Sequence, residues 1–355
     1  MEYKLLSLKD RDIWNNYLRR LPLEQQDVYF TPEYYRLYEK NGDGVAYCFV
    51  YEEDDDFVLY PFLKNSINSL GYDLDDEYYD IQGAYGYNGI LSTSLDINLI
   101  CNFTKTFNLF CVENNIVAEF LRLNPIINNL AKNRFDDIRV YDRDNVYVDL
   151  SMDLEDIVKI QYEHSTRKNI KKALKYGLEC KFFYGKDLTS EWLQEFYSIY
   201  THTMDRNSAE SFYYFSIDYF RNIAKSIGDN SLFIFVLFEN KVISCELVML
   251  GSCIAYSFLG GTYSDYYVYR PNDFLKHKIN EILICCGCKY FLLGGGSDGI
   301  LRYKKSFSKE GVITFYISKK IHHENIYSQI LDQWKEKYPD SYEKNKVKLL
   351  GYREI

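Results

Sequence analysis

The chain has 355 residues, of which 47% are apolar and 26% charged, and its formal net charge is -9. This length exceeds what a single hydrophobic core usually organises, so two domains are expected. The apolar content excludes a disordered chain. The acidic balance argues against a uniformly basic surface for nucleic acid, so no DNA partner is expected and any contact with tRNA would have to be local.

The first residues, from Met1 to Leu6, carry charge and lack the apolar stretch of a signal peptide. No run of about 18 apolar residues appears in the sequence, so no transmembrane segment is expected. These features predict a cytoplasmic protein. The nine cysteines contain one cluster, Cys285-Cys286-Gly287-Cys288, at the end of an apolar helical pattern. We interpret it as buried, reduced core thiols and expect no metal site.

The first half is expected to form a domain over residues 1–148. It opens with a short strand and a helix, and Thr31-Pro32 then has the pattern of an N-cap followed by proline at the first helical position. A β-hairpin with an acidic tip, a glycine-containing loop, a helix and a strand follow. The expected ranges are 9–20 and 32–40 for the first two helices, 47–51 and 57–63 for the hairpin, 80–91 for the loop, 97–114 for the third helix and 116–123 for the last strand.

The second half repeats this order and is expected to form a domain over residues 149–335, with a tail at 336–355. The expected strands are 232–239, 242–250 and 254–259, followed by Gly260-Gly261-Thr262, a helix over 272–286, and a strand over 289–293 that runs into three glycines. The shared order indicates a tandem duplication. The sequence therefore predicts an α/β (α+β) fold of two similar halves, each a mixed sheet flanked by helices.

Several phrases of the second half carry a resemblance to a known family. They are Ser165–Ala173 (STRKNIKKA), Tyr200–Asn207 (YTHTMDRN), Gly260-Gly261-Thr262, Arg270-Pro271-Asn272 and Arg302–Phe307 (RYKKSF); Tyr85-Gly86-Tyr87 and Arg122 in the first half also fit. With these phrases in this order, the chain resembles FemAB-like transferases of the peptidoglycan interpeptide-bridge type, which have a tandem GNAT fold.

The resemblance implies an enzyme that transfers an acyl or aminoacyl group directly to an amine. The implied acceptor is a cell-wall peptidoglycan precursor or a related amino sugar, either a small molecule or a lipid-linked sugar-peptide. A lipid-linked substrate would bring peripheral contact with a membrane. The implied donor is aminoacyl-tRNA or acyl-CoA as a co-substrate, with no tightly bound cofactor.

One departure bears on the donor. The acyl-CoA loop of ordinary N-acetyltransferases is missing, and Arg270-Pro271-Asn272-Asp273 stands in its place. Two alternatives stay open beside the transferase of FemAB type. One is an acyl-CoA-dependent N-acyltransferase in surface-polysaccharide biosynthesis, and the other is a non-catalytic binding protein with the GNAT fold.

Direct acyl transfer to an amine needs a neutral amine, a stabilised oxyanion and a protonated leaving group, but no covalent nucleophile. Glu246 is the expected base, because it is the only carboxylate in the apolar strand 242–250; the alternative is neutralisation by an internal Arg or Lys. The other expected catalytic residues are Asp298 as a second base, Lys305 at the phosphate or oxyanion, and Tyr263 as a proton donor.

Basic and amide side chains are the expected substrate contacts. Arg167 and Lys171 lie one helical turn apart and would clamp a diphosphate, unless they form a solvated helix face. Asn272 begins a helix whose N–H groups suit a phosphate or the donor, or it only caps that helix. Lys304, like Lys305, is expected to hold the donor's phosphate or the developing oxyanion, unless both lysines are surface charges. The remaining expected contacts are Arg206, Asn207, Tyr85 and Tyr87.

Overall fold

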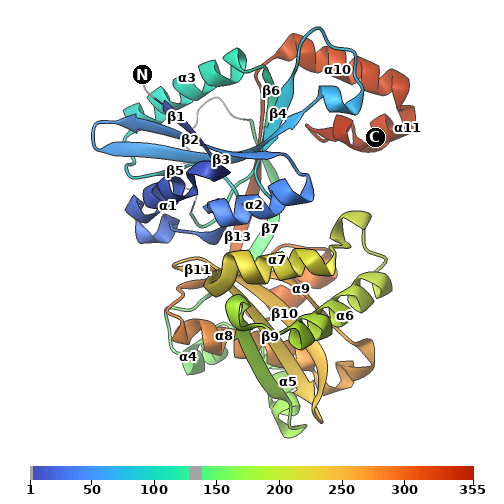
Figure 1. Ribbon diagram of the computed structural model, residues 1–355. Coiled ribbons are helices and arrows are strands. Elements are labelled where there is room, and N and C mark those ends of the chain that lie inside the picture. Colours follow the sequence, from blue (N-terminus) through green and yellow to red (C-terminus); the bar gives the residue numbers. More distant parts are fainter. Residues whose placement is uncertain (1–2, 128–137) are drawn as a thin grey trace. The chain divides into compact units, whose positions relative to one another are not determined.

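The computed structural model describes residues 3–127 and 138–355. They form two compact units (Figure 1). Among the described residues, unit 1 comprises 3–25, 29–127, 138–142 and 315–355, and unit 2 comprises 26–28 and 143–314. Within these residues, no helix combines the length and the apolar character that a membrane span requires.

Unit 1 is built on a mixed sheet with strand order β1-β2-β3-β4-β6-β13, and β5 pairs with β3. Its neighbouring strands are antiparallel except for β4 and β6, which are parallel. Helix α3 lies in the crossover connection that joins the parallel strands β4 and β6. The elements are β1 (Tyr3–Ser7), α1 (Arg11–Arg20), α2 (Pro32–Asn41), β2 (Val45–Glu53), β3 (Asp56–Ser66), β4 (Tyr79–Gln82), β5 (Leu91–Ser92), α3 (Ile97–Glu113), β6 (Ile116–Arg122), α10 (Glu324–Lys337) and α11 (Pro339–Asn345).

Helix α2 begins as its sequence predicts. The Thr31 hydroxyl accepts a hydrogen bond from the Tyr34 backbone N–H at 3.2 Å, and Pro32 occupies the first helical turn. The helix ends at Gly42, whose φ of 90° is the left-handed conformation that glycine adopts without steric cost.

The C-terminal segment packs into unit 1 rather than unit 2. Ile330 and Trp334 of α10 and Tyr352 form a buried cluster with residues of the first half, among them Ile67 and Val117. The observed division therefore differs from the predicted limits of 1–148, 149–335 and 336–355. The sequence pattern of α10 shows an apolar face but does not show which of two similar sheets that face covers.

Unit 2 repeats the arrangement with strand order β7-β12-β11-β10-β9-β8. Its strands are antiparallel except for β11 and β12, which are parallel and are joined by α8. The elements are α4 (Leu154–Ile160), α5 (His164–Lys175), β8 (Glu179–Tyr184), α6 (Ser190–Arg206), α7 (Ile217–Ile227), β9 (Ser231–Phe238), β10 (Lys241–Leu250), β11 (Ile254–Thr262), α8 (Pro271–Cys285), β12 (Tyr290–Gly294) and α9 (Asp298–Lys305).

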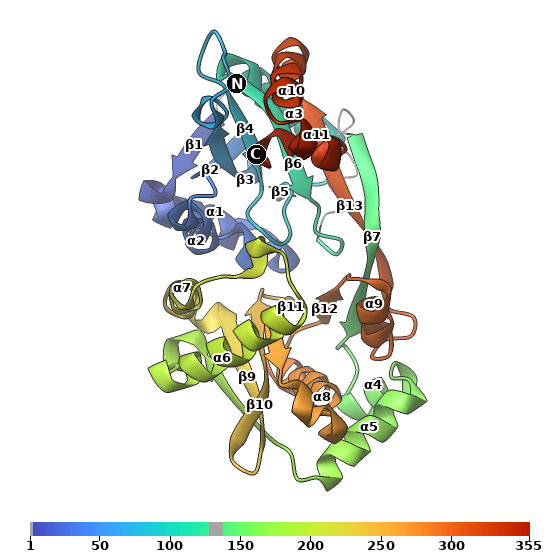
Figure 2. The same ribbon diagram turned by 90° about the vertical axis from the view of Figure 1, so that its right-hand side faces the viewer.

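Helices cover both faces of the unit 2 sheet. Helices α6 and α7 lie on one face and α5 and α8 on the other (Figure 2). Residues 242–250 of β10 are accordingly buried on both sides, as the nearly continuous apolar sequence of this strand indicates. Both units thus contain the predicted hairpin, helix and final strand in that order, and the final strand is parallel to the strand before the helix. In unit 1, part of the expected loop 80–91 forms the strands β4 and β5.

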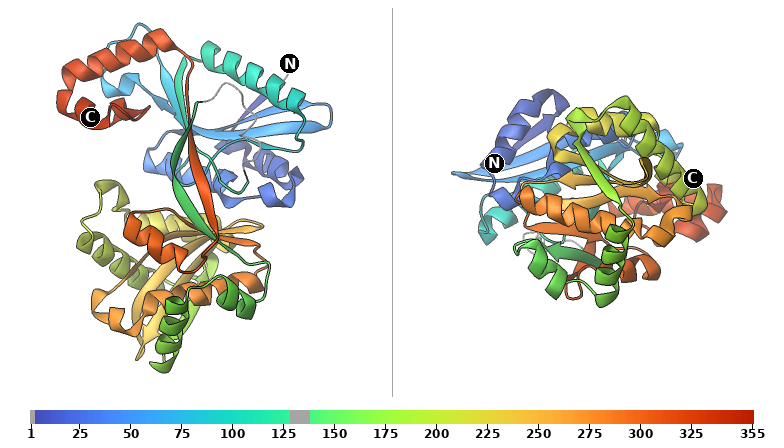
Figure 3. Two further views of the ribbon diagram at one scale, coloured as in Figure 1. Left: turned by 180° about the vertical axis from the view of Figure 1, so that it is seen from behind. Right: turned by 90° about the horizontal axis from the view of Figure 1, so that it is seen from below.

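Two long strands have residues in both units. They are β7 (Ile138–Asp149) and β13 (Val312–Ile321), which appear as extended ribbons in Figure 3. In unit 2, Val146–Asp149 of β7 pair with β12, and in unit 1, Ile317–Ile321 of β13 pair with β6. Each unit's sheet therefore ends in one of these two strands, β13 in unit 1 and β7 in unit 2.

Arg353 anchors the C-terminus of unit 1. Its Nε donates to Asp80 Oδ2 at 2.7 Å, as does the Tyr352 hydroxyl at 2.7 Å, and the Asp80 side chain is fully buried. We expect Arg353→Met to lower the free energy of unfolding by about 3 to 5 kcal/mol, because it leaves a buried carboxylate without its cation. The control Lys348→Met breaks only the exposed pair with Glu354 and is expected to change stability by less than about 1 kcal/mol.

The pH dependence of this loss of stability tests whether the buried Asp80 carboxylate causes it. Burial raises the pKa of Asp80 and Arg353 opposes the rise, so the variant raises this pKa further. A carboxyl group whose pKa is higher in the folded than in the unfolded state costs more stability as pH rises. Urea titrations should therefore show a larger loss at about pH 8 than at about pH 5. A loss that is equal at both would contradict the assignment.

Candidate active site

Helix α8 and strand β10 place polar side chains in register. Asn272 and Lys276 lie one turn apart on α8, about 6 Å along the helix axis, and Ser244 and Glu246 lie two residues apart on β10, about 7 Å along the strand. These spacings match, so the side chains meet in pairs. Ser244 Oγ lies 3.4 Å from Asn272 Oδ1, and Lys276 Nζ contacts Glu246 Oε1.

The pair of Lys276 and Glu246 is a buried ion pair. The two side chains are 9% and 8% exposed, and Ser257 of β11 completes the group by donating to Glu246 Oε1 at 2.7 Å while accepting from Lys276 Nζ at 2.8 Å. Burial lowers the pKa of Lys276, and the adjacent carboxylate opposes that shift. The expected base Glu246 is thus paired with an internal lysine, which is the alternative that the sequence left open.

Lys304 lies beside this ion pair. It is partly buried at the end of α9, and its Nζ donates to the Gly295 carbonyl oxygen in the loop after β12. Burial lowers the pKa of Lys304 to about 7, the positive charges of Lys276 and Arg143 add to the shift, and Glu246 opposes it. Lys304 is therefore an amine whose surroundings make it lose its proton more easily than an exposed lysine does.

Gly295 permits this arrangement through a close backbone approach. A Cβ atom on Gly295 would lie 2.7 Å from Arg143 Cδ and 2.8 Å from the Asp144 carbonyl oxygen, so the loop lies directly against β7. A side chain at this position would displace the carbonyl that Lys304 contacts.

Tyr303 contributes an unsatisfied hydroxyl group. Its Oη is buried and has no hydrogen-bond partner among the described residues. Burial raises its pKa, and the carboxylates of Asp273 and Glu246 add to the shift, so the phenol stays protonated. A buried hydroxyl without a partner is costly in a folded protein and is characteristic of a functional site.

A second group of polar atoms surrounds Thr262 at the end of β11. The Thr262 hydroxyl lies 2.6 Å from Ser244 Oγ and donates to Asn272 Oδ1, so Asn272 holds the start of α8 against the strand. Arg206 donates to the Thr262 carbonyl oxygen at 2.7 Å, and its guanidinium group lies 5.4 Å from the centre of the Tyr267 ring. Asn207, the next residue, is exposed at the end of α6.

The start of α8 carries a carboxylate. Asp273 lies in the first turn, Asn169 donates to it at 3.3 Å, and burial raises its pKa. A carboxylate at a helix N-terminus satisfies the positive end of the helix dipole. Asp273 therefore lies at the helix start, where the sequence led us to expect a phosphate or the donor.

Several expected residues have other contacts. Arg167 donates to the carbonyl oxygens of Lys159 at 3.0 Å and Tyr162 at 2.9 Å, and so caps the end of α4. Lys171 is exposed on α5, and Asp298 is exposed at the start of α9. Lys305 Nζ lies 3.9 Å from Asp144 Oδ2, and Tyr263 Oη lies 3.3 Å from Ser198 Oγ.

Tyr85 and Tyr87 belong to unit 1. The Tyr34 hydroxyl donates to the Tyr85 carbonyl oxygen at 2.6 Å, and the Tyr87 ring meets the rings of Tyr29 and Phe315 edge to face. Gly86 between them has a φ of 102° and faces the Tyr29 ring, so this loop is packed tightly by aromatic contacts.

Sequence reasoning missed Lys276, Ser257 and Tyr303. Lys276 follows Asn272 by one helical turn, so the pattern of α8 held a signal for it. Tyr303 lies within the phrase Arg302–Phe307 that was singled out for the lysines beside it. Ser257 has no signal, because a single serine in a strand does not indicate its partners.

Comparisons with known proteins agree with this architecture. The FemAB family model matches residues 134–241. A crystal structure of FemX superposes with a TM-score of 0.68 at 12% identity, covering 92% of this chain and 99% of that one. No curated protein matches the chain in sequence.

Two further structures share the fold. The structure of L-PGS from Bacillus licheniformis has a TM-score of 0.57 at 12% identity, covering 88% of this chain and 92% of that chain. A tandem GNAT protein from the clavulanic acid biosynthesis pathway has a TM-score of 0.50 at 7% identity, covering 90% and 98%. The predicted α/β fold with two tandem GNAT-type halves is confirmed.

A double-mutant cycle tests the buried ion pair. Lys276→Met and Glu246→Met each leave one charge buried without its partner and are expected to lower the free energy of unfolding by about 3 to 5 kcal/mol. The double variant should lose much less than the sum, because an apolar pair replaces two buried charges. Chemical denaturation measures all three, with Lys225→Met on the exposed side of α7 as the control. Additive losses would show that the two side chains do not interact.

Proposed function

We propose that this FemAB-like transferase forms an amide by moving an acyl or aminoacyl group directly onto an amine of a cell-wall peptidoglycan precursor or a related amino sugar. The observation that carries the proposal is the placement of the Lys304 amine, which is partly buried, donates to the Gly295 carbonyl oxygen and lies beside a buried ion pair, where burial lowers its pKa to about 7. The FemAB match over residues 134–241 supports the class of reaction.

The proposed reaction needs two proton transfers, one from the acceptor amine and one to the leaving group. The acceptor amine attacks the carbonyl carbon of the donor ester or thioester, a C–N bond forms, and neutral Lys304 takes the proton that the amine loses. The C–O or C–S bond of the donor then breaks, and the leaving group receives a proton either directly from protonated Lys304 or from the Tyr303 hydroxyl, which protonated Lys304 then reprotonates. Every proton is conserved, and no covalent enzyme intermediate is needed.

The Lys276–Glu246 pair supports this role electrostatically. The positive charge of Lys276 lowers the pKa of Lys304 while the carboxylate of Glu246 moderates the shift. Glu246 therefore acts through Lys304 and is a positioning residue in this proposal. Arg206, with its guanidinium group near Tyr267 at the end of β11, is proposed to contact the acceptor, together with Asn207.

Aminoacyl-tRNA is the proposed donor. Acyl-CoA is disfavoured because Asp273 occupies the first turn of α8 and the acyl-CoA loop is missing from the sequence. The carboxylate repels a diphosphate at the helix start, where a CoA-dependent enzyme would bind it.

Lys304 and Lys305 form a matched pair of variants for the proposed base. Lys304→Met and Lys304→Arg are both expected to lower kcat by about 10²- to 10⁴-fold, because neither side chain accepts a proton at neutral pH. Lys305→Met should lower it far less, because Lys305 is more exposed and lies 3.9 Å from Asp144. Steady-state amide formation measures each rate. Full activity in Lys304→Arg would overturn the assignment of Lys304 as the base.

The pH dependence of kcat shows which protonation state of Lys304 is the active one. The neutral form of Lys304 is the active one, so kcat of the native protein is expected to rise with pH through about 7. In Lys304→Arg this limb should be absent. A profile that instead falls as pH rises through this value would mean that Lys304 acts as a cation.

The donor is tested by single-turnover assays with one acceptor, a uridine diphosphate-linked muramyl peptide. Charged tRNA is expected to yield an amide product, and acetyl-CoA or a longer acyl-CoA is expected to yield none. Product from acyl-CoA alone would replace the proposed donor, and Asp273→Ala should then raise its affinity because the competing carboxylate is gone.

A further inference from the structure

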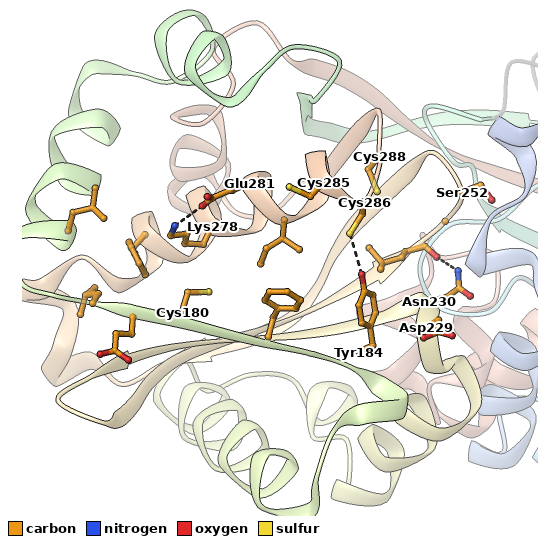
Figure 4. Close-up of a pocket in the computed structure, with 18 residues that line it drawn as sticks. Cys180, Tyr184, Asp229, Asn230, Ser252, Lys278, Glu281, Cys285, Cys286 and Cys288 are labelled. Carbon is orange, nitrogen blue, oxygen red and sulfur yellow. Dashed lines mark hydrogen bonds and ion pairs between the residues drawn. The ribbon is translucent and has the colours of Figure 1, made fainter.

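Unit 2 contains a large pocket that takes no part in the proposed transfer site. It has a volume of about 1180 Å³ and lies between α8 and the edge strand β8, with the end of α5 along its rim. Figure 4 shows that Lys278, Glu281 and Cys285 of α8 lie across the pocket from Cys180 and Tyr184 of β8. The pocket is large enough for a sizeable organic ligand.

The lining of the pocket is mainly apolar. Side chains at positions i, i+4, i+7, i+8 and i+11 of α8 line it, and so do Cys180, Phe182 and Tyr184, which alternate along β8. The apolar lining residues are Leu174, Leu178, Phe182, Leu250, Phe274 and Ile282. Leu174 and Phe182 are 52% and 47% exposed, so the apolar surface continues to the outside of the protein.

The cysteine cluster belongs to this pocket, which corrects its interpretation as buried core thiols. Cys285 and Cys286 are exposed, whereas Cys288 is buried, and all three thiols are free. Cys286 Sγ lies 3.4 Å from the Tyr184 hydroxyl (Figure 4). Helix α8 ends at Cys285, and Cys286 lies in the turn that follows. The apolar sequence pattern continues past the end of the helix, which is why it wrongly predicted that these thiols are buried.

A basic helix borders the same pocket. Residues 164–175 of α5 include five arginine and lysine residues and no acidic residue, although the whole chain is acidic. Lys171 and Lys175 are exposed and lie one turn apart on α5, and Leu174 follows Lys171 by three residues. The exposed lysines of this helix are Lys168, Lys171, Lys172 and Lys175.

The acidic residues of the lining leave this charge largely uncompensated. Glu281 pairs with Lys278 at 2.6 Å, and Asp229 pairs with Lys186 at 2.6 Å. Glu179 is the third acidic residue of the lining, which contains one lysine, and four exposed lysines lie on α5, the helix that contributes Leu174 to the lining. The pocket therefore combines a mainly apolar lining with the neighbouring basic helix α5, which complements a molecule that has a long apolar chain and an anionic head.

We propose that this pocket binds an anionic phospholipid, with an acyl chain between α8 and β8 and the phosphate on the lysines of α5. Lys171 and Lys175 carry the phosphate contact, and Leu174 and Phe182 meet the apolar region of the bilayer. This site is separate from Lys304 and its neighbours, so its failure leaves the proposed transfer reaction untouched.

Vesicle co-sedimentation of the full chain tests the charge requirement. Vesicles that contain phosphatidylglycerol should bind the protein, and vesicles of phosphatidylcholine alone should not. Lys171→Glu/Lys175→Glu should weaken binding by roughly thirtyfold or more, since each lysine near an anionic surface contributes about fivefold. The matched control Lys225→Glu/Lys309→Glu changes two exposed lysines outside α5 and should bind as the native protein does.

A second pair of variants tests the apolar contact. Leu174→Ser/Phe182→Ser alters two exposed side chains and is expected to weaken vesicle binding without changing the thermal unfolding temperature. Leu109→Ser/Val112→Ser on α3, also exposed, is the control and should leave binding unchanged. Equal binding by all variants, or equal binding to phosphatidylcholine vesicles, would overturn the proposal.

Thiol labelling reports on occupation of the pocket itself. Phosphatidylglycerol vesicles should slow alkylation of Cys285 and Cys286, measured by mass spectrometry, while Cys101 in unit 1 keeps its rate. Inorganic phosphate at the same concentration should give no protection. Binding to vesicles with no protection of either thiol would show that the charge attracts the membrane while the pocket stays empty, which contradicts the acyl-chain contact.

Discussion

The buried ion pair between Lys276 and Glu246 is the interaction on which the candidate site depends. It joins α8 to β10 across the face of the unit 2 sheet, with Ser257 of β11 bonded to both charges. Two charges at this depth are stable only together, because either one alone would carry the full cost of desolvation. The pair therefore fixes the helix against the strands and places a paired positive charge close to Lys304, whose pKa it helps to lower.

The duplicated architecture explains how such a site arises. In both units a helix crosses between two parallel strands, and in unit 2 that helix is α8. The equivalent helix of unit 1, α3, buries Phe103, Phe107 and Phe110 against its sheet. The same topology thus holds an aromatic core in one unit and a polar, charged group in the other, and the proposed chemistry belongs to unit 2.

Much of the fold could be predicted from the sequence because its signals are local. Thr31-Pro32 marked a helix start, and the apolar run of 242–250 marked a strand buried on both faces. The packing of α10 on unit 1 could not be predicted, since the apolar face of this helix does not show which sheet it covers. The exposed thiols of Cys285 and Cys286 were misread for a similar reason, because an apolar pattern does not show where a helix ends.

The candidate site was predictable in part. Glu246, Asn272 and Lys304 were singled out by residue type and place, but their partners depend on contacts between elements far apart in the sequence. The pairing of Glu246 with Lys276 spans 30 positions, and the shifted pKa of Lys304 depends on burial that no local pattern reveals. These contacts are the basis on which we propose Glu246 as a positioning residue, in place of the expected base, and Lys304 as the proton acceptor.

The most direct measurement is an NMR titration of the Lys304 side-chain amine in the folded protein. The resonance is assigned by its loss in Lys304→Arg. The Lys304 amine is expected to titrate with a pKa of about 7. A pKa near the value of about 10.4 that is usual for lysine would show that the amine is fully charged at neutral pH and would contradict its role as the base.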